Sequence, residues 1–248
     1  EITNKSSKLF DLLYFIYRVM DKVCFKITKH HRSDSGLFSI SGFYFCDKTI
    51  KKIPSSITHN KVYLAGYFQD EKVCRDVINH INSDLVIKDK VSEKTSNYIK
   101  RIKKNDTVIA VSIRIGEDYK KFGWPVCNRA FYENGVKKIS QQTGCRKVFV
   151  FSDNIDLIEK ERWFAEYDAV FVSGCNSVES LDIMKRCHHY VIANSTFSWW
   201  GAYLSEFREK MIVAPRYFYA GIEMNQCDIA IPGTIYLDNY TGELIDEK

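Results

Sequence analysis

Three polar clusters in the second half of the chain combine residue types that bind phosphate or sugar hydroxyl groups. Each follows a short apolar run: Arg114 follows residues 107–113, Asp153 follows residues 147–151, and the Asn194-Ser195-Thr196 turn follows residues 190–193. In open parallel sheets, ligands bind beyond the carboxyl ends of the strands. If these runs are strands of one such sheet, the clusters share one edge and form one binding site.

Among these residues, Arg114 is the one whose charge most requires a partner. A guanidinium group directly after an apolar strand is costly unless an anion meets it, and its planar fork fits a diphosphate. An ion pair with Asp118 is the alternative role for this side chain. Gly116 would let the backbone turn away from the strand or approach a ligand closely. We predict that Arg114 contacts phosphate, and the ion pair remains the alternative.

The other two clusters also allow two interpretations each. The Asn194-Ser195-Thr196 turn precedes a predicted helix, and a helix N-terminus attracts anions through its backbone N–H groups. Plain N-capping uses the same residue types. Asp153 either accepts hydrogen bonds from a ribose or a base edge, or caps a helix that begins at Ile155. The residues alone leave both choices open.

A repeating pattern of elements could position these clusters. From about residue 106, short β-branched runs alternate with helical segments, which predicts βαβ units on a parallel sheet covered on both faces. The expected strands are 107–113, 147–151, 169–172, 190–193 and 211–214. The expected helices are 129–142, 155–164, 178–187 and 197–207.

The first part of the chain is less regular. Apolar residues at three- and four-residue steps predict a helix over 7–27 that buries one face, and its basic flank also suits a membrane surface. Residues 61–68 predict a strand and 70–82 a helix, whereas residues 30–57 follow no clear pattern. We expect a domain boundary between 105 and 106.

Composition narrows the class of protein. The 248 residues are 45% hydrophobic, enough for one large domain or two modest ones. The formal net charge of +5 is spread along the chain, which argues against a nucleic-acid-binding stripe. The sequence shows neither a signal peptide nor an uninterrupted apolar stretch for a membrane span. We therefore expect a cytoplasmic protein.

Cysteine and histidine spacing gives no sign of a metal centre. The eight cysteines form no CxxC pair and no zinc-finger cluster, so we interpret them as reduced thiols. His188 and His189 lack further ligands at suitable spacing, and we expect them to be structural. Neither glycine-rich phosphate loop, GxGxxG or GxxxxGK[ST], occurs. The sequence thus predicts no metal and no redox cofactor.

Several segments resemble a known family. Residues 182–204, which run through Cys187-His188-His189-Tyr190 to Trp199-Trp200-Gly201, are similar to the signature of the bacterial α-1,2-fucosyltransferases, glycosyltransferase family 11. Residues 151–154, 64–69 and 213–215 resemble further segments of that family. The resemblance extends from about residue 60 to about residue 220.

The resemblance implies an α/β fold of GT-B type, with two Rossmann-like lobes. Residues 106–248 would form the C-terminal lobe that holds GDP-fucose, and residues 1–105 the acceptor-side lobe, to which the last helix or tail could return. It also implies an inverting, metal-independent galactoside α-1,2-fucosyltransferase that uses no cofactor. The donor would be GDP-fucose, and the acceptor the 2-hydroxyl of a galactose in an O-antigen, capsule or related glycan. Peripheral contact with the inner membrane would fit this chemistry.

The resemblance also assigns roles by position. Arg114 would neutralise the β-phosphate as GDP leaves, and Asp153 would read the guanosine. Asp118 and Glu117 are the nearest carboxylates in sequence, and either could act as a general base or orient Arg114. The predicted catalytic residues are Arg114 and Asp118. The predicted substrate-binding residues are Ser112, Gly116, Asp153, Asn194, Ser195, Thr196, Phe197 and Ser198.

The chain departs from the family in two places. The segment 112–119 lacks the histidine and the second arginine of the motif His-x-Arg-Arg-Gly-Asp-Tyr. The N-terminal Gly-Gly-Leu-Gly-Asn-Gln loop has no counterpart, so we expect an incomplete first lobe. The alternative function is therefore a truncated or degenerate module that binds nucleotide sugar or glycan without turnover.

Overall fold

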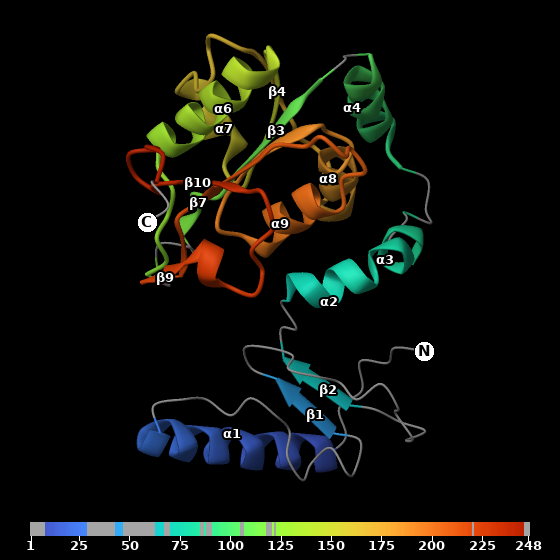
Figure 1. Cartoon of the computed structure of the whole chain (residues 1–248). Coiled ribbons are helices and arrows are strands. Elements are labelled where there is room, and N and C mark those ends of the chain that lie inside the picture. Colours follow the sequence, from blue (N-terminus) through green and yellow to red (C-terminus); the bar gives the residue numbers. More distant parts are fainter. Residues whose placement is uncertain are drawn as a thin grey trace. The chain divides into compact units, whose positions relative to one another are not determined.

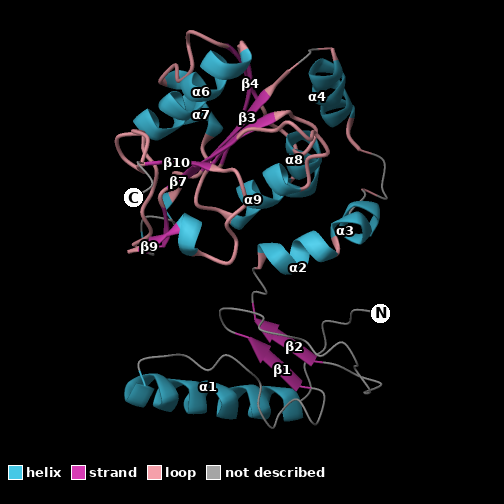
Figure 2. Ribbon diagram, viewed as in Figure 1, coloured by secondary structure: helices cyan, strands magenta, loops and turns pink. Residues whose placement is uncertain are grey.

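The chain forms two compact units, Glu1–Val73 and Cys74–Lys248. The computed structural model describes residues 8–28, 43–46, 63–66, 70–84, 87, 91–104, 107–117, 121, 123–219 and 221–245 (Figure 1). Helices and strands alternate through most of the second unit (Figure 2). The α/β class expected from the sequence is confirmed.

The described residues of the first unit form one helix and a parallel pair of strands. Helix α1 spans Lys8–Thr28, strand β1 spans Phe43–Cys46 and strand β2 spans Tyr63–Gly66, with Phe43 opposite Tyr63. The predicted helix 7–27 and strand 61–68 are confirmed. Strand β1 was not predicted, because it is a four-residue run inside a stretch without periodicity.

Helix α1 buries Tyr17 completely but leaves a row of apolar side chains in solvent. A helix packed on its domain through one apolar face would cover these residues. The exposed large apolar residues of α1 are Leu9, Leu12, Phe15, Ile16, Val19, Met20, Val23 and Ile27. Among the side chains of α1 that the structure describes, only Tyr17 is buried, so the predicted burial of the apolar face is not confirmed.

The second unit is built on one six-stranded sheet in which every neighbouring pair is parallel. Its order is β10-β7-β6-β3-β4-β5, the doubly wound order in which strand succession reverses between β3 and β6. The strands are β3 (Ile109–Ile113), β4 (Lys147–Ser152), β5 (Asp168–Phe171), β6 (His189–Ile192), β7 (Ile212–Pro215) and β10 (Ile235–Leu237). The five predicted strands are confirmed, and β10 was missed.

Helices cover both faces of this sheet, as expected for parallel strands. Helices α6 and α7 lie on one face, and α4, α8 and α9 on the other (Figures 1 and 2). The helices described in this unit are α3 (Ile78–Asp84), α4 (Glu93–Lys103), α6 (Arg129–Thr143), α7 (Ile155–Lys160), α8 (Ser177–Met184) and α9 (Thr196–Tyr203), and α2 (Glu71–Asp76) crosses the boundary. Strands β8 (Tyr217–Tyr219) and β9 (Ile222–Glu223) and the 3-10 helix η2 (Met224–Gln226) follow β7.

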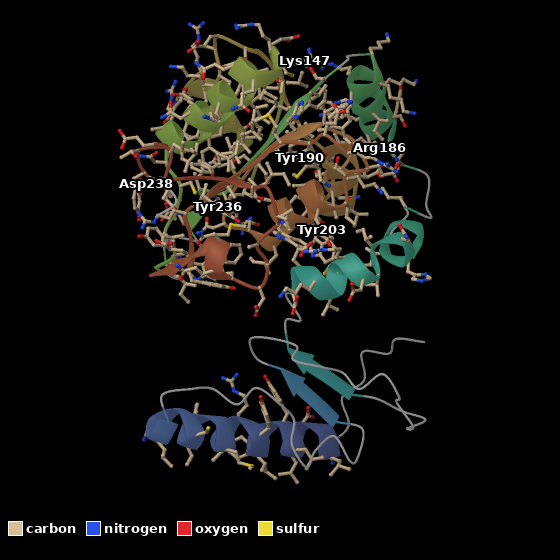
Figure 3. The ribbon with its side chains drawn as sticks, viewed as in Figure 1. Lys147, Arg186, Tyr190, Tyr203, Tyr236 and Asp238 are labelled. Atoms are coloured by element: carbon tan, nitrogen blue, oxygen red, sulfur yellow. The ribbon has the colours of Figure 1, made fainter. Side chains whose placement is uncertain are left out.

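The two faces carry two separate apolar cores. One fills the layer between the sheet and helices α6 and α7, and includes Val111, Val150 and Phe131. The other lies under α4, α8 and α9, where Tyr190 and Tyr203 are labelled in Figure 3. A parallel sheet with two buried faces explains why its strands are nearly continuous apolar runs.

Because helix α4 packs on the second unit, the domain boundary differs from the predicted one. The Tyr98 hydroxyl donates to the carbonyl of Phe171 at the end of β5, and the Ser92 N–H donates to Glu179 of α8. The hydrogen bonds from Ser92 lower the pKa of Glu179 to about 2. Residues 91–104 therefore belong to the second unit, and the boundary lies between 73 and 74 rather than between 105 and 106.

The described tail pairs with the sheet of the second unit. Leu244 forms an antiparallel bridge with Leu237 of β10, and the Ile245 N–H donates to the carbonyl of Tyr236 at 3.3 Å. Within the described part of the chain, no helix has both the length and the apolar character needed to cross a bilayer.

Candidate functional site

A pocket of about 370 Å³ opens at the carboxyl edge of the sheet. Its walls come from the ends of β3, β4 and β5 and from the first turns of α8 and α9. It lies beside the reversal of strand order, where doubly wound sheets bind their ligands. The predicted site residues that line it are Ser112, Arg114, Asp153, Ser195, Phe197 and Ser198.

Arg114 extends from the end of β3 next to Asp153 at the end of β4. Its Nε lies 3.3 Å from Asp153 Oδ2, and 36% of its side chain remains exposed. The same carboxylate accepts hydrogen bonds from the backbone N–H groups of Ile115 at 3.1 Å and Gly116 at 2.9 Å. The ion pair considered for Arg114 is thus made with Asp153, while Asp118 lies outside the described residues.

Ser112 and Ser198 connect β3 to α9 from inside the pocket wall. Their hydroxyl groups share a hydrogen bond of 2.7 Å, and 6% of Ser112 and 1% of Ser198 are exposed. Burial with a polar partner satisfies both groups. These two serines therefore set the position of the α9 N-terminus relative to β3.

The first turn of α9 presents Ser195 to the pocket without using it as a side-chain cap. Ser195 is the N-cap residue, with extended backbone at φ −138° and ψ 132°, but its hydroxyl accepts no capping hydrogen bond. Its carbonyl accepts the Trp199 N–H at 2.9 Å. Helix N-termini offer N–H groups that lack intrahelical partners. The plain-capping alternative for the Ser195 side chain is therefore not what the structure contains.

Three of the predicted site residues that the structure describes do not line the pocket. The Gly116 N–H is engaged by Asp153, and Thr196 is exposed on the first turn of α9. Asn194 is 1% exposed, and its Nδ2 donates to the carbonyl of Phe218 at 3.1 Å. Asn194 thus holds β8 against the end of β6.

The loop after β5 forms a wall of the pocket that we did not predict. Ser173, Gly174 and Cys175 line it together with Ser177 and Ser180 of α8. Asn176 caps α8 in a reciprocal capping box with Glu179. The loop directly follows the third predicted strand, so its position at a carboxyl strand end is the sequence signal for this wall.

The backbone conformation at position 174 requires glycine. Its φ is +69°, a region that side-chain-bearing residues rarely adopt, and a Cβ there would lie 2.6 Å from Nζ of Lys94 on α4. Helix α4, remote in sequence, therefore lies against this wall of the pocket.

His188 and His189 act as hydrogen-bond acceptors at the opposite end of the strands. His188 Nδ1 accepts the Val108 N–H before β3, and His189 Nδ1 accepts the Met211 N–H before β7, both at 3.1 Å. Burial lowers both pKa values, which favours the neutral rings that can accept. Among the residues described, no group of three or more potential metal ligands occurs.

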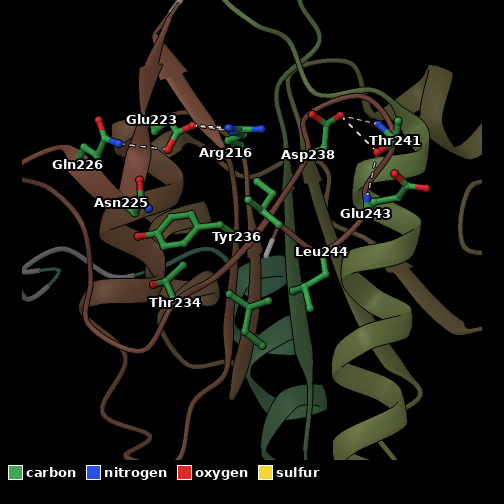
Figure 4. A pocket seen from close by; sticks show the side chains of 12 residues that line it. Arg216, Glu223, Asn225, Gln226, Thr234, Tyr236, Asp238, Thr241, Glu243 and Leu244 are labelled. Atoms are coloured by element: carbon green, nitrogen blue, oxygen red, sulfur yellow. Dashed lines mark hydrogen bonds and ion pairs between the residues drawn. The ribbon is translucent and has the colours of Figure 1, made fainter. Parts of the chain in front are cut away.

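A larger hollow, about 1130 Å³, lies beyond β7 and β10 (Figure 4). Three of its charged groups are engaged with neighbours: Arg216 Nε lies 2.8 Å from Glu223, and Asp238 accepts the Thr241 N–H at 2.9 Å. None of the described residues predicted for the site lines it. We take the smaller pocket as the candidate site because predicted site residues from several elements meet there.

A sequence model of glycosyl transferase family 11 matches residues 37–238. The chain belongs to this family. The resemblance found in residues 60–220 is thereby confirmed.

Two curated relatives from Escherichia coli fit this membership. The O-antigen biosynthesis glycosyltransferase WbnK is 34% identical over 65% of this chain, and an alpha-1,2-colitosyltransferase is 27% identical over 72%. The family 11 chain spans 57% and 63% of the lengths of these two proteins.

Two solved structures of POFUT1 show a partial likeness. The complex with GDP-fucose is 20% identical, with a TM-score of 0.38, and the match covers 49% of this chain and 46% of that one. The complex with GDP is 21% identical, with a TM-score of 0.32, and the match covers 46% and 44%.

Proposed function

We propose that this glycosyltransferase moves L-fucose from GDP-fucose to the 2-hydroxyl of a galactose in an O-antigen, capsule or related glycan. Support comes from the family membership and from the names of the two relatives, one an O-antigen enzyme and one an alpha-1,2-transferase. Colitose is the alternative sugar, because one relative transfers it.

The observation that carries the proposal is the convergence of Arg114 with two helix N-termini on one pocket. Arg114, Ser177 of α8 and Ser195 of α9 all line it. Guanidinium groups and helix N-termini both favour phosphate. We assign the diphosphate of the donor to Arg114 and to Ser195 and Phe197, which line the pocket, through hydroxyl or backbone N–H groups.

The chemistry of an inverting transfer fits such a site. The acceptor hydroxyl oxygen bonds to the anomeric carbon as the bond from that carbon to the diphosphate oxygen breaks. Negative charge then grows on the departing GDP, and prearranged positive groups stabilise it most in the transition state. Arg114 and the two helix N-termini would supply this charge without a metal ion. The acceptor proton passes to a base, for which we propose Asp118.

A binding module without turnover is the competing function. The shorter span of this chain relative to its relatives favours testing it directly. Calorimetry with GDP and GDP-fucose, run beside a transfer and hydrolysis assay, separates the two. Binding with neither product would support the module and contradict the enzyme.

A donor screen tests the proposed reaction. The full chain is incubated with GDP-fucose, GDP-mannose, UDP-sugars and nucleotide-linked colitose, with lactose and N-acetyllactosamine as acceptors. We expect transfer from GDP-fucose alone, with an α-1,2 linkage to galactose in the product by NMR. Transfer of colitose alone would replace the donor, and transfer to another hydroxyl would overturn the linkage.

We also propose that α1 lies on an anionic membrane surface. Its exposed apolar residues, such as Leu12 and Phe15, share the helix with Lys8, Arg18, Lys22 and Lys26. Helices with an apolar stripe and a basic flank bind at the interface of acidic lipids. This location would bring the enzyme to lipid-linked glycan acceptors.

Vesicle sedimentation tests the membrane contact. We expect the chain to sediment with vesicles of acidic phospholipid more than with neutral ones, and Phe15→Glu to reduce this binding. Ile222→Glu, at an exposed apolar residue of β9, is the matched control and should bind as the wild type does. Equal binding of the Phe15→Glu variant would rule out α1 as the contact.

A further inference from the structure

We propose that Asp153 is a positioning residue that holds Arg114 in place for the diphosphate, and that it does not read the guanosine. This inference rests on the donor site proposed above. It changes the role of the residue from recognising the nucleoside to fixing the cation that meets the phosphates.

Strand register places the two side chains together. In the parallel pair of β3 and β4, Ile113 lies opposite Ser152, so Arg114 and Asp153 are the next residues beyond the paired ends. The ion pair therefore connects two positions that the sheet itself holds adjacent. Its geometry does not depend on a long or flexible segment.

Consecutive backbone N–H groups of the Arg114 loop are held by side chains from other elements. The Arg114 N–H donates to the hydroxyl of Tyr132 on α6 at 3.3 Å. The next two, of Ile115 and Gly116, donate to the two oxygens of Asp153. Tyr132 is fully buried, and 16% of the Asp153 side chain is exposed. The loop is thus fixed at three adjacent residues from two sides.

The orientation of Asp153 fits positioning better than ligand recognition. Oδ2 meets both the Gly116 N–H and Arg114 Nε, while Oδ1 meets the Ile115 N–H. The ion pair at 3.3 Å keeps the guanidinium group beside Asp153, and a fixed place for a charge is what transition-state stabilisation requires. Loss of the carboxylate should therefore weaken phosphate contacts and leave nucleoside contacts intact.

Asp153→Asn is the informative variant because it keeps the shape and changes the hydrogen bonding. An amide offers one acceptor oxygen and one NH₂ donor, so one of the two backbone N–H groups would face another donor. The negative charge beside Arg114 is also lost. Tyr132→Phe loosens the same loop from the other side and serves as a second variant. Asp156→Asn, at an exposed carboxylate in the first turn of α7, is the matched control.

Calorimetry on the full chain compares GDP with guanosine, which lacks the phosphates. We expect Asp153→Asn to weaken GDP binding about tenfold, as for contacting residues coupled by about 1.4 kcal/mol, with guanosine affinity unchanged. Tyr132→Phe should likewise weaken the binding of GDP and leave the affinity for guanosine unchanged. In an Arg114→Ala background, Asp153→Asn should have no further effect, because it acts through the arginine.

Steady-state kinetics add a readout that a loss of folding alone would not give. We expect kcat of Asp153→Asn to fall by more than the donor KM rises, while Asp156→Asn matches the wild type. Equal weakening of guanosine and GDP, or additive losses in the Arg114→Ala background, would overturn the positioning role. Absence of GDP binding in the wild type would instead overturn the donor site itself.

Discussion

Ser112 and Ser198 share a hydrogen bond that joins β3 to the first turn of α9, although 86 residues separate them in sequence. Strand β3 is one of the two strands at the reversal of the sheet, and α9 follows the other, β6. The bond therefore connects both sides of the reversal at the pocket wall. Removal of the bond should lower the stability of the protein, and a double-mutant cycle attributes the loss to this pair.

Ser198→Ala should lower the free energy of unfolding by about 1–3 kcal/mol, because the buried Ser112 hydroxyl loses this partner. Ser112→Ala should cost a similar amount. The double variant should cost clearly less than the sum, since both polar groups are then gone. Urea denaturation of the four proteins measures the cycle, and strictly additive losses would contradict the shared bond.

Gly201→Ala should lower the free energy of unfolding by about 1–3 kcal/mol through overpacking of α9 against α8. A Cβ at Gly201 would meet Met184 Sδ and would lie 2.8 Å from its Cγ. Met184 is completely buried, so its side chain has little room to move. The same substitution in a Met184→Ala background should cost less. Thermal unfolding compares them, and an unchanged cost would exclude this clash.

Stability should fall between neutral and mildly acidic pH because of His188 and His189. Their pKa values are lowered by burial, and for His189 also by the charge of His188, below the unfolded value of about 6.5. The folded state therefore binds protons less readily, and its advantage is complete above that value and is lost as pH falls below it.

Urea unfolding at pH 7.5 and at pH 5.5 measures this dependence. Replacing both rings, as His188→Asn with His189→Asn, should reduce the loss of stability over that interval. An undiminished pH dependence in the double variant would assign the effect to other histidines.

The elements that could be predicted from the sequence are those whose local residue pattern matches their burial in the fold. Strands such as 109–113 are fully buried on both faces, so their apolar runs are uninterrupted. Helix α4 was missed because its buried residues are only Thr95, Tyr98 and Ile102 among polar neighbours. Strand β10 was missed because three residues carry too little pattern.

The site could be predicted as an edge of the sheet but not as a set of contacts. The positions of Arg114 and Ser195 after strands placed them on one edge, as the pocket shows. The pairing of Arg114 with Asp153 depends on the register of β3 and β4, which no local pattern encodes. For the same reason, the burial of Asn194 and of Ser112 against other elements could not be foreseen.

The central claim is that Arg114 stabilises the charge of a departing nucleoside diphosphate. Removing one such preorganised charge commonly costs on the order of a hundredfold in rate. The decisive measurement is kcat for transfer from GDP-fucose to lactose by the wild type and by Arg114→Ala, with circular dichroism to verify the fold. We predict a loss of at least about a hundredfold in the variant with an unchanged spectrum, and transfer at the wild-type rate would contradict the account.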